Sequence, residues 1–149
     1  VGIVPGIRRF AAEKRQVNLA ISLHAANDAL RSMLIPANHK YPLSPLMEAC
    51  GEYIKLTNRR LTFEWAMIKD VNDSVEHARE LAALLKGLLC HVNIIPLNPT
   101  TSYNGKATTE ERAQEFKQVL ENNGIPCTIR ARRGIDISAG CGQLAARRA

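Results

Sequence analysis

The sequence lacks any apolar segment long enough to cross a membrane. Its longest apolar-rich stretch, residues 81–92, is interrupted by Lys86 and His91, whereas a spanning helix needs about 20 apolar residues. The start, residues 1–5, has neither the basic segment nor the small-residue cleavage site of a secretory signal. These absences argue against a membrane protein or a secreted protein, and we expect a cytoplasmic location.

Cysteine is also scarce, and its spacing excludes several kinds of site. The four cysteines are Cys50, Cys90, Cys127 and Cys141, and no two of them form a CxxC pair. A zinc ribbon and a thiol redox motif are therefore excluded. The sequence also has no P-loop, no GxGxxG and no HExxH motif. We expect no metal site within this chain.

Charge is unevenly distributed along the sequence. The formal net charge is +6, and basic residues crowd the last twenty positions, at Arg130, Arg132, Arg133, Arg147 and Arg148. Such a surface attracts phosphate backbones or anionic membranes. Because no basic amphipathic helix is apparent, nucleic acid is favoured over membrane. An ordinary solvated face remains the alternative.

Apolar, β-branched segments alternate with helical patterns along the 149 residues, which suffice for one domain with a real core. We predict strands at residues 18–23, 61–67, 91–95 and 127–132, and a strand tail at 1–5. Helices are predicted to begin near Ser44, at an Asp73–Glu76 capping box and at a Thr108–Glu111 capping box. The alternation predicts right-handed βαβ crossovers and a mostly parallel sheet, hence an α/β fold.

Ligands of such sheets bind at the carboxyl ends of the strands. Three predicted loops begin there, at Ser22-Leu23-His24, at Ile68-Lys69-Asp70 and at Pro96-Leu97-Asn98. The His24 imidazole can bind a ligand or a backbone carbonyl. The Asn98 carboxamide can both donate and accept, although an Asx-turn before proline is its common alternative use. These two side chains are the candidate binding groups of this edge.

Cys141 differs from the other cysteines in its surroundings. It lies between Gly140 and Gly142 with no amphipathic pattern around it. A thiol on such a loop is accessible, and Arg132 and Arg133 would favour its thiolate, which is a good nucleophile. The alternative is a stray thiol near the chain end. The other three cysteines occupy apolar positions, where a thiol behaves as a small hydrophobe.

The sequence resembles the radical SAM adenosine methyltransferases that modify 23S ribosomal RNA and certain transfer RNAs. The segments that carry the resemblance are residues 22–25 (SLHA), 71–73 (VND), 93–98 (NIIPLN) and 134–144 (GIDISAGCGQL). The resemblance implies the C-terminal portion of a partial (β/α)6 barrel with mostly parallel strands and a C-terminal extension. Residues 1–149 would be one truncated radical SAM domain, with a barrel half at 1–126 and a C-terminal strand and catalytic tail at 127–149.

The resemblance also implies a chemistry. Ser22, Leu23, His24 and Asn98 match positions that bind S-adenosylmethionine, and Cys141 matches the cysteine that is itself methylated. A radical generated at a 4Fe–4S cluster would then allow the S-methyl carbon to add to C2 of an adenine in 23S rRNA or tRNA. The alternatives are the antibiotic-resistance branch, which methylates C8, a non-catalytic RNA-binding module, and a βα-barrel enzyme without radical chemistry.

The sequence departs from this family in three respects, one of which is that the Gly-Glu segment that holds the methionine amino group is absent. The CxxxCxxC segment that binds the cluster is absent from these 149 residues, and no cysteine here matches the family's second, resolving cysteine. We therefore expect the isolated chain to bind no cluster and to be inactive as a methyltransferase. We also expect it to self-associate through the parallel sheet edge that truncation would expose.

Overall fold

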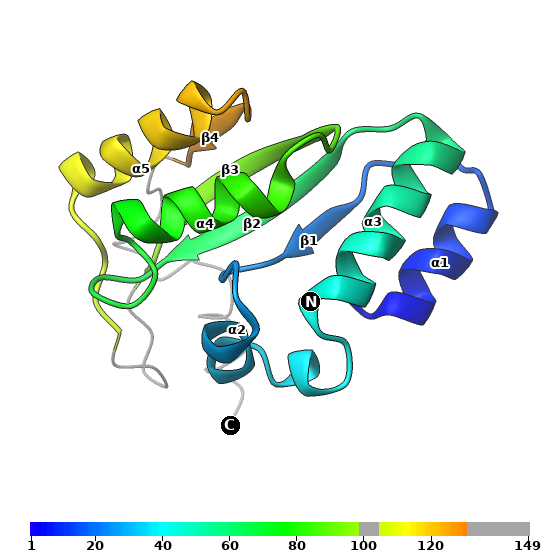
Figure 1. Ribbon diagram of the computed structural model, residues 1–149, viewed down its shortest axis with the longest axis horizontal. Helices are drawn as coiled ribbons and strands as arrows, with labels where there is room; N and C mark the ends of the chain where they lie inside the picture. The colour runs from blue at the N-terminus through cyan, green and yellow to red at the C-terminus, as the bar shows by residue number, and fades with distance from the viewer. Residues whose placement is uncertain (99–104, 131–149) are drawn as a thin grey trace.

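The computed structural model describes residues 1–98 and 105–130, which form a parallel sheet with helices packed on it (Figure 1). The sheet has the order β1-β2-β3-β4 and every pair is parallel. Its strands are β1 (Ala20–Ser22), β2 (Leu61–Met67), β3 (Cys90–Pro96) and β4 (Cys127–Ile129). The helices are α1 (Val4–Ala12), α2 (Asp28–Leu34), the short 3-10 helix η1 (Pro36–His39), α3 (Leu43–Thr57), α4 (Val75–Leu85) and α5 (Glu110–Asn122). The predicted α/β fold with parallel strands is confirmed.

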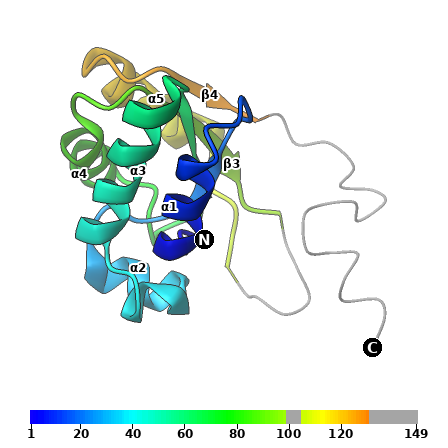
Figure 2. The same cartoon turned by 90° about the vertical axis from the view of Figure 1, so that its right-hand side faces the viewer.

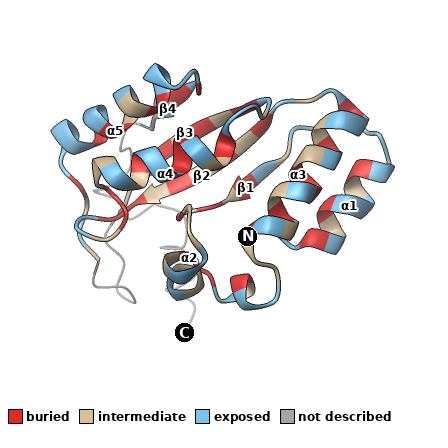
Figure 3. Cartoon of the chain, viewed as in Figure 1, coloured by how far each residue is buried: buried red, intermediate tan, exposed pale blue. Residues whose placement is uncertain are grey.

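The two faces of the sheet differ in character because side chains alternate along each strand. One row across the sheet is apolar and buried, and it consists of Ile21, Phe63, Val92 and Cys127. Helices α3, α4 and α5 lie along this side of the sheet (Figure 2), and buried residues line both the strands and the inner sides of these helices (Figure 3). The ring centroids of Trp65 and Phe116 lie 5.4 Å apart where β2 meets α5. The core therefore occupies one side of the sheet.

The predicted strand tail at residues 1–5 is wrong, because helix α1 begins at Val4. Pro5 lies in its first turn, where a fixed φ suits the helix and the missing N–H costs no hydrogen bond. Val4, Ile7 and Ala11 recur at helical spacing and are buried. A short apolar run does not distinguish strand from helix, and the following helical spacing decides the structure here.

Both predicted helix N-caps are displaced by one residue, and of these two helices α4 alone has a capping box, formed by Ser74 and His77. Ser74, not Asp73, caps α4, and its hydroxyl accepts a hydrogen bond from the backbone N–H of His77. Thr109, not Thr108, caps α5. Thr108 instead donates to Asp73, with 2.6 Å between their oxygens. Asp73 and Thr108, which were predicted as helix caps, are instead joined to each other by a buried tertiary hydrogen bond.

Helices α2 and η1 were not among the sequence predictions. Helix α2 begins after Asn27, whose side-chain oxygen accepts from the backbone N–H of Leu30 and so serves as its N-cap. Across residues 1–98 and 105–130, no helix is long and apolar enough to cross a membrane.

Strand β1 lies at one end of the sheet order. Its outer edge has no strand partner within the part of the chain that the structure describes. Backbone groups on such an edge can pair with another chain. The expected self-association through this edge stays a prediction.

Candidate ligand site at the carboxyl ends of the strands

The predicted binding residues lie at the side of the sheet where the carboxyl ends of the strands meet, as the parallel strand order requires. Hydrogen bonds join the strand ends: the N–H of Leu23 donates to the carbonyl of Glu64 at 3.0 Å, and that of Leu97 donates to the carbonyl of Met67 at 3.0 Å. The loops that follow β1, β2 and β3 are therefore neighbours (Figure 1). This edge is the candidate ligand site.

His24 is held in an uncommon conformation directly after β1. Its backbone has a φ of 59°, in the left-handed region, and its ring Nδ1 accepts a hydrogen bond of 3.0 Å from the backbone N–H of Ala66. Burial lowers the pKa of His24 to about 4, and the positive charges of Arg31 and the Val1 amino group add to this, while the Glu64 carbonyl opposes it. The imidazole is therefore neutral near neutral pH, with its hydrogen on Nε2. It presents one N–H donor.

The lowered pKa of His24 makes the stability of the fold depend on pH. In the unfolded chain His24 is protonated below its ordinary pKa of about 6.5. In the folded chain its pKa is about 4, so it is protonated only at lower pH. Acid therefore favours the unfolded chain over this window. We expect this residue alone to lower the free energy of unfolding by about 2 kcal/mol between pH ~7 and pH ~4.5. Urea unfolding at the two pH values measures this loss.

The matched variants for this experiment are His24→Gln and His39→Gln. His39 is exposed, so its replacement should leave the pH-dependent loss as it is in the unaltered chain. The loss should be smaller in His24→Gln. An equal loss in all three proteins would show that His24 does not titrate as described.

Ser22 and Leu23 are fixed by a buried arginine from helix α2. The guanidinium of Arg31 donates from Nε to the carbonyl of Leu23 at 3.1 Å and from Nη2 to the carbonyl of Ser22 at 3.3 Å. The Leu23 side chain is 0% exposed and belongs to the core. Leu23 can therefore reach a ligand only through its backbone, whereas Ser22 is half-buried on the opposite side of the strand.

Asn98 follows β3 and carries a polar atom that lacks a partner. Its Oδ1 is buried, and no donor from residues 1–98 or 105–130 lies within hydrogen-bonding distance. A buried carboxamide oxygen without a donor is costly, and it calls for a partner such as a ligand or water. The Asx-turn alternative involves residues beyond position 98, and these lie outside the described ranges.

A polar row crosses the face of the sheet opposite the core. The register aligns Ser22 with Glu64, Glu64 with Asn93, and Asn93 with Thr128. Asn93 Nδ2 donates to Glu64 Oε2 at 3.0 Å, and His91 Nε2 lies 2.9 Å from Thr128 Oγ1. This row was not predicted from the sequence, although Thr62, Glu64 and Ala66 alternate with buried residues along β2. This period of two was the available signal.

The loop after β2 is tied to the start of α5 by a buried carboxylate. Asp73 is 3% exposed, and it accepts hydrogen bonds from the Asp70 backbone at 2.9 Å and from Thr108 and Arg112. Burial acts to raise the pKa of Asp73, but the hydrogen bonds from Thr108, Arg112 and Asp70 outweigh it and lower the pKa. This network fixes the loop without contributing a free polar group to the strand ends.

The cysteines that the structure describes are core residues, as predicted. Cys50, Cys90 and Cys127 are all buried. Burial raises their pKa values to about 12, about 11 and about 12. Their thiols are therefore protonated and poor ligands or nucleophiles. No group of three or more metal-ligating side chains occurs within the described residues. Cys141 lies outside these ranges.

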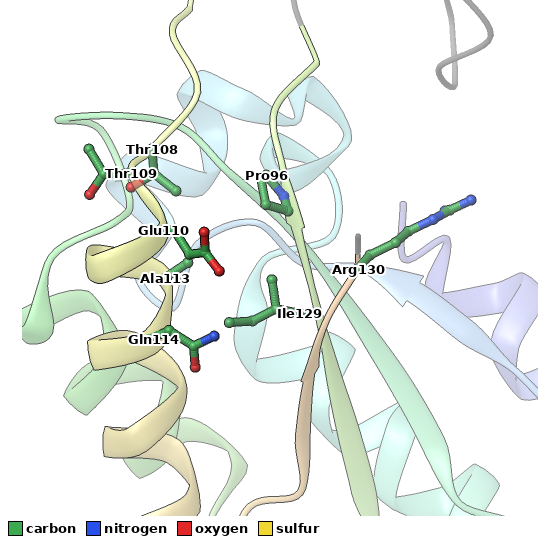
Figure 4. A pocket seen from close by; sticks show the side chains of 8 residues that line it. All are labelled: Pro96, Thr108, Thr109, Glu110, Ala113, Gln114, Ile129 and Arg130. Carbon is green, nitrogen blue, oxygen red and sulfur yellow. The ribbon is translucent and has the colours of Figure 1, made fainter. Parts of the chain in front are cut away.

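A cavity of about 320 Å³ lies beside the strand ends, between α5 and the ends of β3 and β4. Its lining includes Thr108, Glu110, Gln114 and Ile129. Glu110 and Gln114 extend toward Ile129, while Arg130 extends away from the helix (Figure 4). None of Ser22, Leu23, His24 and Asn98 lines this cavity. It is therefore separate from the candidate ligand site.

Comparisons with known proteins agree with the fold and the resemblance. The chain is 55% identical over 144 residues to the probable dual-specificity RNA methyltransferase RlmN of Caldanaerobacter subterraneus, and 52% identical over 146 residues to the dual-specificity RNA methyltransferase RlmN 1 of Myxococcus xanthus. These matches cover 97% and 98% of the chain but 42% and 41% of the two relatives. The chain thus spans about two fifths of the length of these relatives. No family model matches the chain.

Two solved structures are similar to this one. A radical SAM methyltransferase from Sphaerobacter thermophilus superposes with a TM-score of 0.92 at 55% identity, over 95% of this chain and 42% of that one. A domain of the pyruvate-formate lyase-activating enzyme from Bacteroides vulgatus superposes with a TM-score of 0.62 at 15% identity, which shows a shared fold alone. The high identity extends over almost all of the sequence, so this chain is similar along nearly its whole length to part of the RlmN RNA methyltransferases and to part of a radical SAM methyltransferase.

Proposed function

We propose that this chain is the C-terminal part of an enzyme that methylates C2 of adenosine in 23S rRNA and tRNA. Residues 1–126 would be half of a partial barrel, and residues 127–149 would be its last strand and catalytic tail. The observation that carries the proposal is the strand-end site, where a neutral His24 with its hydrogen on Nε2 follows β1 and Asn98 follows β3, with β2 between these two strands. The enzyme would act in the cytoplasm, where both RNA substrates occur.

The side chains at this edge fit S-adenosylmethionine, which supplies the methyl group when bound. Its ribose hydroxyls, adenine ring and carboxylate need both donors and acceptors. Ser22 and His24 offer donors, and Asn98 has a buried Oδ1 that accepts no hydrogen bond from residues 1–98 or 105–130. The core position of Leu23 holds the backbone of this segment in place. The site therefore matches a ligand with several polar groups rather than a purely apolar one.

Cys141 would receive the methyl group. With S-adenosylmethionine bound, the Cys141 thiolate would take the methyl group from the sulfonium sulfur, and S-adenosylhomocysteine would be released. This step needs no other reactant. The role of Cys141 rests on the resemblance of residues 134–144, because these residues lie outside the described ranges.

The cysteines in the described part of the chain do not fit an iron–sulfur cluster. The three described cysteines are buried, far apart in the sequence, and protonated because their pKa values are raised. We expect anaerobic reconstitution of the 149-residue chain with iron and sulfide to give no cluster absorption band and no methyl transfer. An absorption band that persists after desalting would contradict this expectation.

The longer protein that carries this sequence provides the test of function. We expect it to methylate C2 of adenosine in 23S rRNA and tRNA, detected by mass spectrometry of digested RNA. His24→Ala should strongly reduce this product, whereas the matched His39→Ala should not. Methylation at C8 instead would favour the antibiotic-resistance branch. RNA binding without any methylation would favour the non-catalytic RNA-binding module.

A further inference from the structure

Asn72 is a buried residue that joins the ends of two strands. It is 0% exposed. Its Nδ2 donates to the carbonyl of His24 at 2.8 Å and to the carbonyl of Ala66 at 2.8 Å, and its Oδ1 accepts from the N–H of Ile68 at 2.7 Å. Trp65 Nε1 donates to the Asn72 carbonyl at 3.2 Å. The side-chain amide therefore has partners at both its oxygen and its nitrogen.

These hydrogen bonds and the one from Ala66 form a closed ring that includes Nδ1 of the His24 imidazole. Asn72 holds the carbonyls of His24 and Ala66, and the N–H of Ala66 in turn donates to His24 Nδ1. Asn72 thus holds the backbone of His24 next to Ala66, the residue whose N–H fixes the imidazole. The ring nitrogen takes the place that a strand carbonyl would have beside Ala66.

The backbone of His24 needs such support. Its φ of 59° lies in the left-handed region, which costs a residue other than glycine roughly 1–2 kcal/mol. A conformation of this kind persists only where surrounding contacts hold it. The carbonyl of His24 has Asn72 as its partner, so the amide opposes relaxation of this strand end.

We propose that Asn72 is a positioning residue that holds His24 in the orientation and tautomer in which Nε2 donates to the ligand. The identity of that ligand rests on the proposed function, but the effect on the imidazole does not. The charged groups that act on this ring are Arg31 from α2 and the Val1 amino group, while Glu64 acts through its backbone carbonyl. None of these belongs to the Asn72 loop.

Two variants in this loop separate positioning from stability. Asn72→Ser removes the amide that reaches His24 and Ala66. Asp73→Asn is the matched control, because Asp73 is the next residue and is also buried, but its hydrogen bonds go to Asp70, Thr108 and Arg112. A purely structural role would make the two variants alike. Trp65→Phe is a third variant that keeps the Asn72 amide: it removes the donor to the Asn72 carbonyl and also makes the buried ring beside Phe116 smaller.

The readout is the His24 imidazole itself, observed by long-range 1H–15N NMR across a pH titration of the 149-residue chain. In the unaltered chain, Nδ1 should be unprotonated and the pKa should be about 4. In Asn72→Ser we expect the pKa to move toward the ordinary value of about 6.5 and the two neutral tautomers to mix. Trp65→Phe should change the pKa and the tautomer populations of His24 in the same direction but by less. Asp73→Asn should leave the pKa and the tautomer populations unchanged.

Two outcomes would overturn the proposal. One is an unchanged His24 signal in folded Asn72→Ser, or in Trp65→Phe if Asn72→Ser does not fold. The other is an equal change in Asp73→Asn. The affinity for S-adenosylhomocysteine is measured separately, and we expect Asn72→Ser to weaken it about tenfold, as for the loss of one hydrogen bond. If the unaltered chain and the longer enzyme bind no S-adenosylhomocysteine, the proposed function fails while the NMR result still decides the role of Asn72.

Discussion

Replacement of Arg31 by methionine is expected to lower the free energy of unfolding by about 4 kcal/mol. Arg31 is 0% exposed and makes hydrogen bonds to the carbonyls of Val1, Ser22 and Leu23 and to Asn38 Oδ1. Methionine fills much of the same volume but has no donor, so these oxygens would lose a charged partner. Denaturant unfolding measures the loss.

The reason for so large an effect is the position of Arg31 between three parts of the chain. Burial lowers the pKa of its guanidinium, and the nearby Asp28 acts in the opposite direction. Asp28 also accepts from Asn38 and from the backbone N–H of Leu43. The cation on α2 thus connects the N-terminal residue, the end of β1 and the 3-10 helix η1. Arg31→Lys should lose less, because it keeps the charge but not the planar fork of donors.

Arg8→Met is the matched control. Arg8 is exposed, and its guanidinium donates hydrogen bonds to both carboxylate oxygens of Glu52. Exposed ion pairs contribute little to stability, so this variant should unfold nearly as the unaltered chain does. If Arg31→Met were as stable as Arg8→Met, Arg31 would not be the support of the candidate ligand site.

Replacement of Cys141 by serine in the longer enzyme is expected to abolish methylation of RNA, by a factor of at least about 10⁴. The proposed step requires a thiolate, and a serine hydroxyl is not ionised near neutral pH. The protein should still bind RNA and S-adenosylmethionine. Mass spectrometry of the protein should show a methyl group on Cys141 in the unaltered enzyme and none in the variant.

Cys127→Ala is the control for this second prediction. Cys127 is buried at the start of β4, and burial raises the pKa of its thiol to about 12. It has no part in the proposed chemistry, so RNA methylation should persist in a folded Cys127→Ala enzyme. Full activity of Cys141→Ser, or a methyl group found on Cys127, would contradict the role given to Cys141.

The strands were the most predictable part of the fold, and the reason is their residue pattern. Residues 61–67 were predicted as a strand and form β2 with these bounds, because large apolar residues alternate there with Thr62, Glu64 and Ala66. The predicted strand at 91–95 extends by one residue at each end. Helix α1 was missed because residues 1–5, taken by themselves, fit an apolar strand equally well.

The position of the candidate ligand site followed from parallel topology, but its supports did not. A parallel sheet places the ends of β1, β2 and β3 at one edge, so Ser22, His24 and Asn98 could be named in advance. Arg31 and Asn72 have no local pattern that reveals their task. Asn72 reaches His24 across 48 positions of sequence, and a contact of this kind becomes visible only in the folded chain. The same holds for Thr108, which was predicted to cap a helix but instead donates a hydrogen bond to Asp73.

The central claim is that the strand ends bear part of a site for S-adenosylmethionine. An NMR titration of the 149-residue chain with S-adenosylhomocysteine tests it most directly, because it reports the location of binding residue by residue. We expect chemical-shift changes centred on Ser22, Leu23, His24 and Asn98, and a loss of these changes in His24→Gln. Changes centred instead on Glu110, Gln114 and Ile129, which line the cavity beside α5, or no changes at saturating ligand, would contradict it.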